Sequence, residues 1–112
     1  MTKENKKLLF KDLCNRLPYN VKCQFKDITY IVHDGDVPYY DNILTTRHLG
    51  LFINRSNYYI KPYLRSMNSM TAEERKEYDN FAYIDSIEIY DWLNEHHFDY
   101  RGLIEKGLAI EF

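Results

Sequence analysis

The apolar residues change their spacing at Pro18, and this change constrains the fold more than any other feature of the sequence. Before Pro18 they recur every three or four residues, which predicts a helix over about residues 3–16. Proline ends that helix because it disfavours helical geometry at Leu17 and cannot donate a backbone hydrogen bond. After it, apolar and polar residues alternate, as they do along a half-buried strand. The apolar face of the predicted helix consists of Leu9, Phe10, Leu13, Cys14 and Leu17, and Lys6, Lys7, Lys11 and Asp12 lie away from it.

The alternation recurs along the chain and predicts an antiparallel sheet of three or four strands. No glycine accompanies Lys26-Asp27, so the junction of the first two strands is either a tight turn or a bulge in one long strand. The segment HDGDVPYYDN, residues 33–42, has the composition of a loop. Pro62 places the second half of the last strand at a sheet edge or beyond the ladder. The predicted strands cover residues 21–25, 28–32, 49–53 and 58–64.

Helical patterns return in the C-terminal part of the chain. Thr71 and Glu74 have the spacing of a capping box, in which each side chain bonds the other residue's backbone N–H, and they predict a surface helix over residues 72–81. The segment DSIE, residues 85–88, opens a second helix in a similar way, with Ile84 and Ile89 at the spacing of a hydrophobic staple. This helix is expected to end near residue 97. Its inward face consists of Ile89, Trp92, Leu93 and His96.

The stretch NEHHFDYRGLIEKGL, residues 94–108, suits either a catalytic or metal site or the join between two helices. Neighbouring helical positions point about 100° apart, so one metal ion does not readily take both His96 and His97. Zinc motifs space their histidines further apart. Asp99 suits the N-cap of a short helix over residues 100–106, and Gly107 suits the left-handed residue that follows a helix. We therefore predict helix termini here, and neither catalytic nor metal-binding residues.

Together these elements predict an α+β fold in a single globular domain over residues 1–112. An N-terminal helix is followed by a three- or four-stranded antiparallel sheet, with the C-terminal helices packed on the sheet. Cys14 and Cys23 are too few for a disulfide framework, and both are expected to be reduced and buried. The expected core comprises Phe10, Leu13, Leu17, Val21, Phe25, Ile53, Trp92, Leu93 and Leu103.

The sequence gives little support to catalysis or membrane insertion. Its apolar runs are too short to span a bilayer, and its start lacks the pattern of a signal peptide, so the cytoplasm is the expected location. It contains no phosphate-binding glycine loop, nucleophile elbow or HExxH motif. The segment HDGD, residues 33–36, lacks the further ligands of a calcium loop and is interpreted as a turn. His48 has no obvious partner. We therefore expect no enzymatic activity and no cofactor.

Charge and tyrosine are distributed unevenly. Residues 1–70 hold 11 Lys/Arg and 6 Asp/Glu, a balance of +5, whereas residues 71–112 hold 4 and 11, a balance of −7. Many of the 11 tyrosines lie in the basic half. Aromatic faces there could stack on unpaired bases while Lys and Arg bind phosphates. Tyrosine-rich surfaces also serve protein interfaces.

We therefore expect a non-enzymatic interaction module, with another protein as the first-ranked partner and nucleic acid as the alternative. Tyr59, Lys61, Tyr63 and Arg65 share one strand face if the strand continues through Pro62. Clustering of the basic residues on one face would favour nucleic acid, whereas their dispersion beside an exposed apolar patch would favour protein. The protein-binding candidates are Tyr58, Tyr59, Lys61, Tyr63 and Arg65, and the nucleic-acid-binding candidates are Lys22, Lys26, Arg55, Lys61 and Arg65.

Three blocks of the sequence are distinctive: LLFKDLCNRLPYNVKC (8–23), IKPYLRSMNSMTAEE (60–74) and DWLNEHHFDYRGLIEKGLAIE (91–111). In these blocks the chain resembles a family of small uncharacterised proteins common in gut Bacteroides genomes, phages and mobile elements. Family members often carry a longer insert between the second and third blocks than this chain has. The resemblance implies no established activity and no catalytic residues. It implies a bacterial cytoplasm and an accessory gene whose product binds a protein or a nucleic acid.

Overall fold

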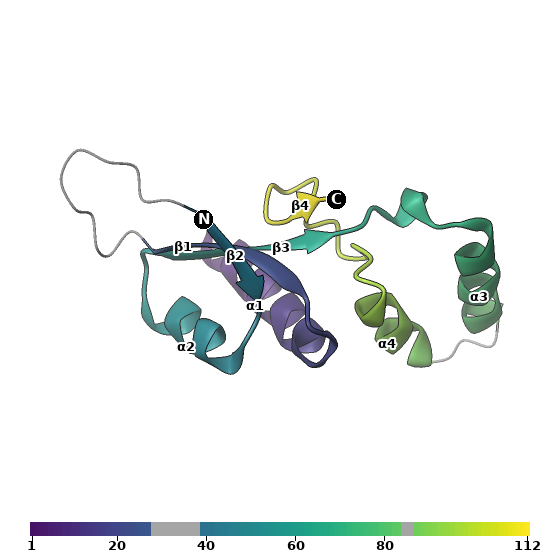
Figure 1. Cartoon of the computed structure of the whole chain (residues 1–112), viewed down its shortest axis with the longest axis horizontal. Helices are drawn as coiled ribbons and strands as arrows, with labels where there is room; N and C mark the ends of the chain where they lie inside the picture. Colours follow the sequence, from purple (N-terminus) through teal and green to yellow (C-terminus); the bar gives the residue numbers. More distant parts are fainter. Residues whose placement is uncertain (28–38, 84–86) are drawn as a thin grey trace.

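The computed structural model describes residues 1–27, 39–83 and 87–112, and within them helices cover one face of a four-stranded sheet (Figure 1). The predicted α+β class is confirmed. No helix among these residues is long and apolar enough to cross a bilayer. The elements in chain order are α1 (Lys3–Arg16), η1 (Leu17–Tyr19), β1 (Lys22–Asp27), β2 (Tyr40–Ile43), α2 (Thr46–Asn54), β3 (Tyr58–Leu64), η3 (Met67–Ser69), α3 (Ala72–Tyr83), α4 (Glu88–Glu95) and β4 (Ile110–Glu111).

The sheet has the strand order β2-β1-β3-β4 and is mixed rather than antiparallel throughout. β1 pairs antiparallel with β2 and β3, whereas β4 pairs parallel with β3. Pro62 lies within the ladder opposite Cys23, and β4 pairs only with Tyr63 and Leu64. In the described part of the chain, the first half of β3, rather than the predicted second half, is therefore open on the β4 side.

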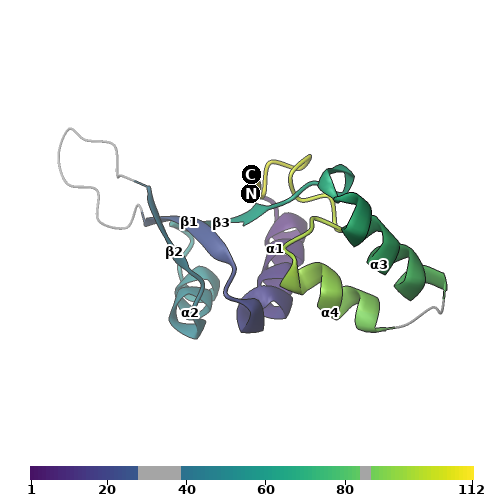
Figure 2. The same cartoon turned by 45° about the vertical axis from the view of Figure 1, so that its right-hand side comes forward.

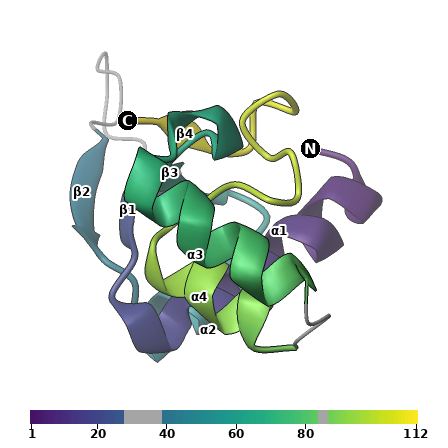
Figure 3. The same cartoon turned by 90° about the vertical axis from the view of Figure 1, so that its right-hand side faces the viewer.

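Helices α1 and α2 lie on the same face of the sheet (Figures 1 and 2). Leu9 and Leu13 of α1 and Phe52 of α2 are buried there with Phe25 and Ile60 of the strands. Helices α3 and α4 pack on each other beyond the end of β3, on the side that faces the viewer in Figure 3, around a second cluster that contains Trp92, Leu93 and Phe98. The other face of the sheet carries no helix in the described part of the chain (Figure 2).

The predicted bounds of α1 are confirmed, but its buried face is not the predicted one. Thr2 caps the helix, since its Oγ1 accepts a 3.1 Å hydrogen bond from the Asn5 backbone N–H. Asp12 is fully buried and Cys14 is exposed. Burial follows residues 9, 12, 13 and 16, because the carboxylate of Asp12 is paired with Arg16 inside the protein. A hydropathy pattern cannot anticipate that pairing.

Residues 46–54 form helix α2, so the strand predicted over residues 49–53 is wrong. Thr45 and His48 form a capping box: the Thr45 N–H donates to His48 Nδ1 at 3.0 Å, and the His48 N–H donates to Thr45 Oγ1 at 3.4 Å. Leu49 and Phe52 are buried at helical spacing, whereas Ile53, a predicted core residue, is 55% exposed. A short apolar run fits both periods, and the cap at Thr45 decides for the helix.

Several other expectations have a mixed outcome. Residues 40–43 form strand β2 rather than loop, and β1 and β3 lie where alternation predicted strands. The capping box of Thr71 and Glu74 is confirmed, with hydrogen bonds of 2.9 and 3.1 Å, and α3 extends to Tyr83. The predicted strand over residues 28–32, the HDGD turn and the opening of the Trp92 helix at residues 84–86 lie outside the described residues.

Candidate functional site

The two adjacent histidines form the end of α4. His97 has a left-handed φ of 61°, its N–H donates to the Asn94 carbonyl at 3.1 Å, and the Phe98 N–H donates to the Leu93 carbonyl at 2.9 Å. These two bonds are the Schellman termination of a helix, with histidine where glycine is usual. The His96 ring stacks on Trp92 at 4.4 Å. His96 is therefore held against Trp92, and His97 forms the left-handed end of the helix.

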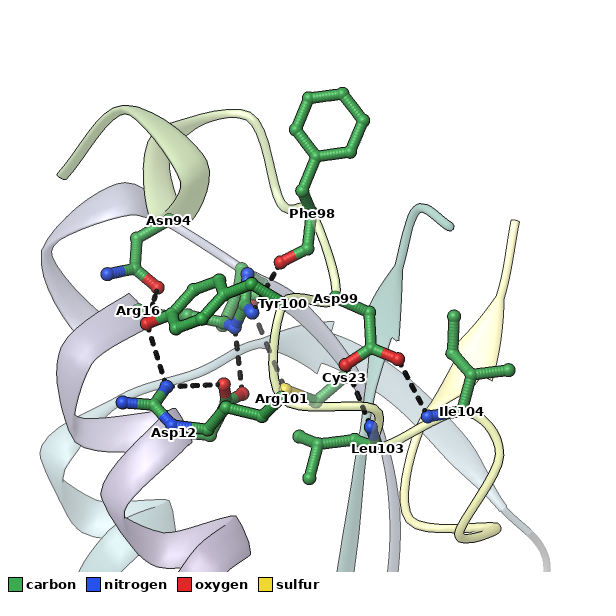
Figure 4. A network of polar contacts seen from close by, with 11 residues as sticks. Asp12, Arg16, Cys23, Asn94, Phe98, Asp99, Tyr100, Arg101, Leu103 and Ile104 are labelled. Atoms are coloured by element: carbon green, nitrogen blue, oxygen red, sulfur yellow. Dashed lines mark hydrogen bonds and ion pairs between the residues drawn. The ribbon is translucent and has the colours of Figure 1, made fainter. Parts of the chain in front are cut away.

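The side chain of Asp99 stabilises the backbone turn that follows it, although this turn does not continue into a helix (Figure 4). Its two carboxylate oxygens accept the backbone N–H groups of Leu103 and Ile104 at 2.8 and 2.9 Å. The helix predicted over residues 100–106 is wrong because Gly102, with a φ of 73°, interrupts right-handed geometry. A single turn then closes at Gly107, whose φ of 72° matches the predicted left-handed residue.

A buried ionic network joins α1 to this C-terminal turn (Figure 4). Asp12 accepts from Arg16 Nε at 2.7 Å and from Arg101 Nη1 at 2.8 Å. Arg16 also donates from Nη2 to the Phe98 carbonyl at 2.6 Å.

The Cys23 thiol lies beside this network. Its burial, and to a smaller extent the negative charge of Asp12, raise the pKa of the thiol to about 12, so Cys23 stays protonated. Hydrogen bonds within the protein therefore engage the Asp12 carboxylate and the Nε and Nη2 atoms of Arg16, whereas Arg16 Nη1 is buried without a partner among the described residues. Among the described residues, no group of three or more His, Cys, Asp or Glu side chains could hold a metal ion.

The outer face of the sheet, which we define as the face opposite α1 and α2, carries lysine and tyrosine. On β3 the side chains of Tyr59, Lys61 and Tyr63 alternate with buried ones, as predicted. On β1, Lys22 and Lys26 alternate with buried side chains in the same way, and the register sets Lys26 opposite Tyr59. The Lys22 Nζ lies 5.5 Å from the centroid of the Tyr63 ring. Cations and rings therefore alternate across this face.

A hollow of about 540 Å³ lies at this face, between the sheet and the C-terminal turn. Lys26, Lys61 and Lys106 line it together with Tyr39 and Tyr59. Lys26 Nζ lies 4.5 Å from the centroid of the Tyr39 ring. No aspartate or glutamate is among the described residues that line the hollow. The hollow therefore combines positive charge with aromatic surface.

The remaining three candidates lie elsewhere. Tyr58 is only 3% exposed and packs towards the core, so it is not a surface contact residue. Arg55 Nη1 pairs with Asp27 at 2.8 Å. Arg65 makes two 2.8 Å hydrogen bonds to the Glu74 carboxylate, which lower the pKa of Glu74 to about 2. The nucleic-acid candidates that gather on the outer face are Lys22, Lys26 and Lys61.

The sequence did not indicate Tyr39 and Lys106 as site residues. Tyr39 precedes β2 in a segment predicted to be loop, and Lys106 arrives through the turn that Asp99 and Gly107 fix. Tertiary packing brings both to the hollow, so no local spacing could have found them.

No family model, curated protein or solved structure matches the chain.

The burial of His97 predicts that acid destabilises the fold. Burial lowers its pKa from the ordinary 6.5, and the nearby cations Arg16, His96 and Arg65 lower it further. The unfolded chain therefore binds the proton more readily than the folded protein does. The contribution of the neutral imidazole to stability is fully present above about pH 6.5 and is lost as the pH drops below that value. His48 contributes in the same direction, since burial lowers its pKa too.

We expect urea unfolding to show lower stability at about pH 5.5 than at about pH 7.5. His97→Asn, which tolerates left-handed φ, should reduce the difference and leave the smaller contribution of His48. Glu74 titrates in a separate, more acidic window. Equal stability of the wild-type protein at both pH values would contradict this assignment.

Proposed function

We propose that the protein is a non-enzymatic binding module whose outer sheet face binds single-stranded nucleic acid. The hollow carries this proposal: three lysines and two tyrosines line it, with no carboxylate among its described lining residues, in a chain whose net charge is −2. Such a local concentration of positive charge attracts a polyanion even when the net charge of the whole protein is negative. The geometry shifts the preference from a protein partner to nucleic acid, because Lys26, Lys61 and Lys106 cluster with two tyrosines at this face.

The arrangement suits unpaired bases rather than a duplex. Tyr39 and Tyr59 offer ring faces on which bases can stack, and Lys26, Lys61 and Lys106 can reach the phosphates between them. Bases in a duplex stack on one another, so a flat sheet face cannot use its rings on them. The lysines that now lie over tyrosine rings are flexible and can move to phosphates when a base takes their place.

The test is fluorescence anisotropy with labelled oligo-dT, oligo-U and a duplex of equal length. Lys26→Ala/Lys61→Ala should weaken single-strand binding by about 10-fold or more and reduce the slope of log Kd against log salt by about 1 to 2. Tyr59→Ala should cost about 1 to 3 kcal/mol of binding. The matched controls are Lys76→Ala and Tyr90→Ala, which are exposed residues of α3 and α4.

Three results would contradict the proposal. The first is that no single strand binds at low salt. The second is that Lys76→Ala weakens binding as much as the double variant does, since binding would then not depend on the outer face. The third is a preference for the duplex, which would exclude base stacking on Tyr39 and Tyr59.

A protein partner remains the second candidate, and strand β2 favours it. β2 is the edge of the sheet, and all four of its residues are exposed. An exposed edge strand can pair with an extended peptide through backbone hydrogen bonds. A pulldown from host lysate with and without nuclease separates the two candidates, because a nucleic-acid-mediated capture disappears with nuclease. The resemblance to proteins of Bacteroides, phages and mobile elements supports a bacterial cytoplasmic setting for either one.

A further inference from the structure

A second surface, unrelated to the outer sheet face, lies where α1 meets α2. This surface, which we call the groove, has a volume of about 380 Å³ and is lined by Phe10, Phe52 and Ile53 with Lys3, Lys6 and Lys7. Ile53 is 55% exposed. Lys6 Nζ lies 5.1 Å from the centroid of the Phe52 ring. The groove therefore suits an apolar side chain that is flanked by negative charge.

The other end of the molecule has the complementary chemistry. Tyr83 is 91% exposed and Ile87 is 83% exposed, the two most exposed large hydrophobic side chains among the described residues. Asp79 lies one helical turn before Tyr83 on α3. We call these three residues the acidic tip. Helices α3 and α4 together carry seven Asp/Glu and two Lys/Arg, whereas α1 carries two Asp/Glu and five Lys/Arg.

We propose that the groove receives the acidic tip of a second copy of this chain. The tip of the same molecule cannot enter its own groove, because α2 and α3 lie on opposite sides of α1 (Figures 1 and 2). Insertion of Tyr83 and Ile87 covers apolar surface on both copies. The lysine rim of one copy then faces the carboxylates of the other, which adds attraction that salt screens.

Sedimentation equilibrium of the full chain tests this self-association, starting from a monomer of 13.6 kDa. The apparent mass should rise with protein concentration, and added salt should lower it. Ile53→Glu in the groove and Tyr83→Ser/Ile87→Ser in the tip should each weaken association by about 10-fold or more. Ile43→Glu is the matched control, because Ile43 is a 40% exposed isoleucine on β2, away from the groove.

Mixing the two variants makes the test specific. The groove variant keeps an intact tip and the tip variant keeps an intact groove, so the mixture should associate although neither variant does so alone. This complementation also shows that both variants fold. A wild-type chain that stays monomeric up to about 1 mM overturns the proposal and leaves the groove to a different partner. Equal weakening by Ile43→Glu, or a mixture that does not associate, overturns it as well.

Discussion

Replacing Asp12 by alanine should destabilise the protein by about 3 to 5 kcal/mol, the cost of removing one partner from a buried ion pair. Asp12 is fully buried, and its carboxylate accepts from both Arg16 and Arg101. Without Asp12, the fully buried guanidinium of Arg16 has lost its counterion and lies near a second cation, Arg101. Urea unfolding at neutral pH measures the loss.

Two further variants separate this effect from a general weakening of α1. Glu4→Ala removes an exposed carboxylate from the same helix and should cost no more than about 1 kcal/mol, through the helix dipole. Asp12→Leu/Arg16→Met removes both buried charges and should recover most of the stability that Asp12→Ala loses. If Asp12→Ala cost no more than Glu4→Ala, the network would not connect α1 to the C-terminal turn as described.

Replacing Trp92 by alanine should have a comparable effect, about 3 to 5 kcal/mol, because it empties the centre of the second cluster. The indole packs against Phe98 at 5.6 Å and against Tyr78 and Phe81 at 6.3 Å. Its Nε1–H also donates to Glu77 at 2.7 Å. Since α3 has no buried residue of its own, these contacts and the Arg65–Glu74 pair attach it to the protein.

The loss of stability in Trp92→Ala should therefore be greater in α3 than in the sheet. Hydrogen exchange of Trp92→Ala should show fast exchange along α3, while the amides of β1 and β3 remain protected. Tyr83→Ala, at an exposed position of α3, should stay within about 0.5 kcal/mol of the wild type. Uniform loss of protection in α3 and the sheet would show instead that the two clusters unfold as one unit.

Local patterns predicted the elements whose signal lies within a few residues. Alternation of buried and exposed side chains identified β1 and β3, although their pairing is long-range, and the Thr71–Glu74 capping box identified the start of α3. Helix α2 was missed because its apolar run is short and its cap uses histidine at the position where glutamate or glutamine is usual. The last predicted helix failed at Gly102, whose left-handed φ the sequence does not reveal.

Long-range pairing limited the prediction of the site in the same way. The exposure of Tyr59, Lys61 and Tyr63 follows from the strand period alone. Arg65 has the same sequence spacing, but it is held by Glu74 on another element, and no periodicity indicates that pair. Lys106 joins the hollow only because the C-terminal turn folds back on the sheet.

The outer sheet face can be tested most directly by two-dimensional NMR of the ¹⁵N-labelled protein during titration with oligo-dT. Binding there should shift the backbone amides of Lys26, Tyr59, Lys61 and Lys106 progressively, with little change along α3 and α4. Shifts confined to α3 and α4, or no shifts at a saturating concentration, would contradict the assignment of this face to nucleic acid.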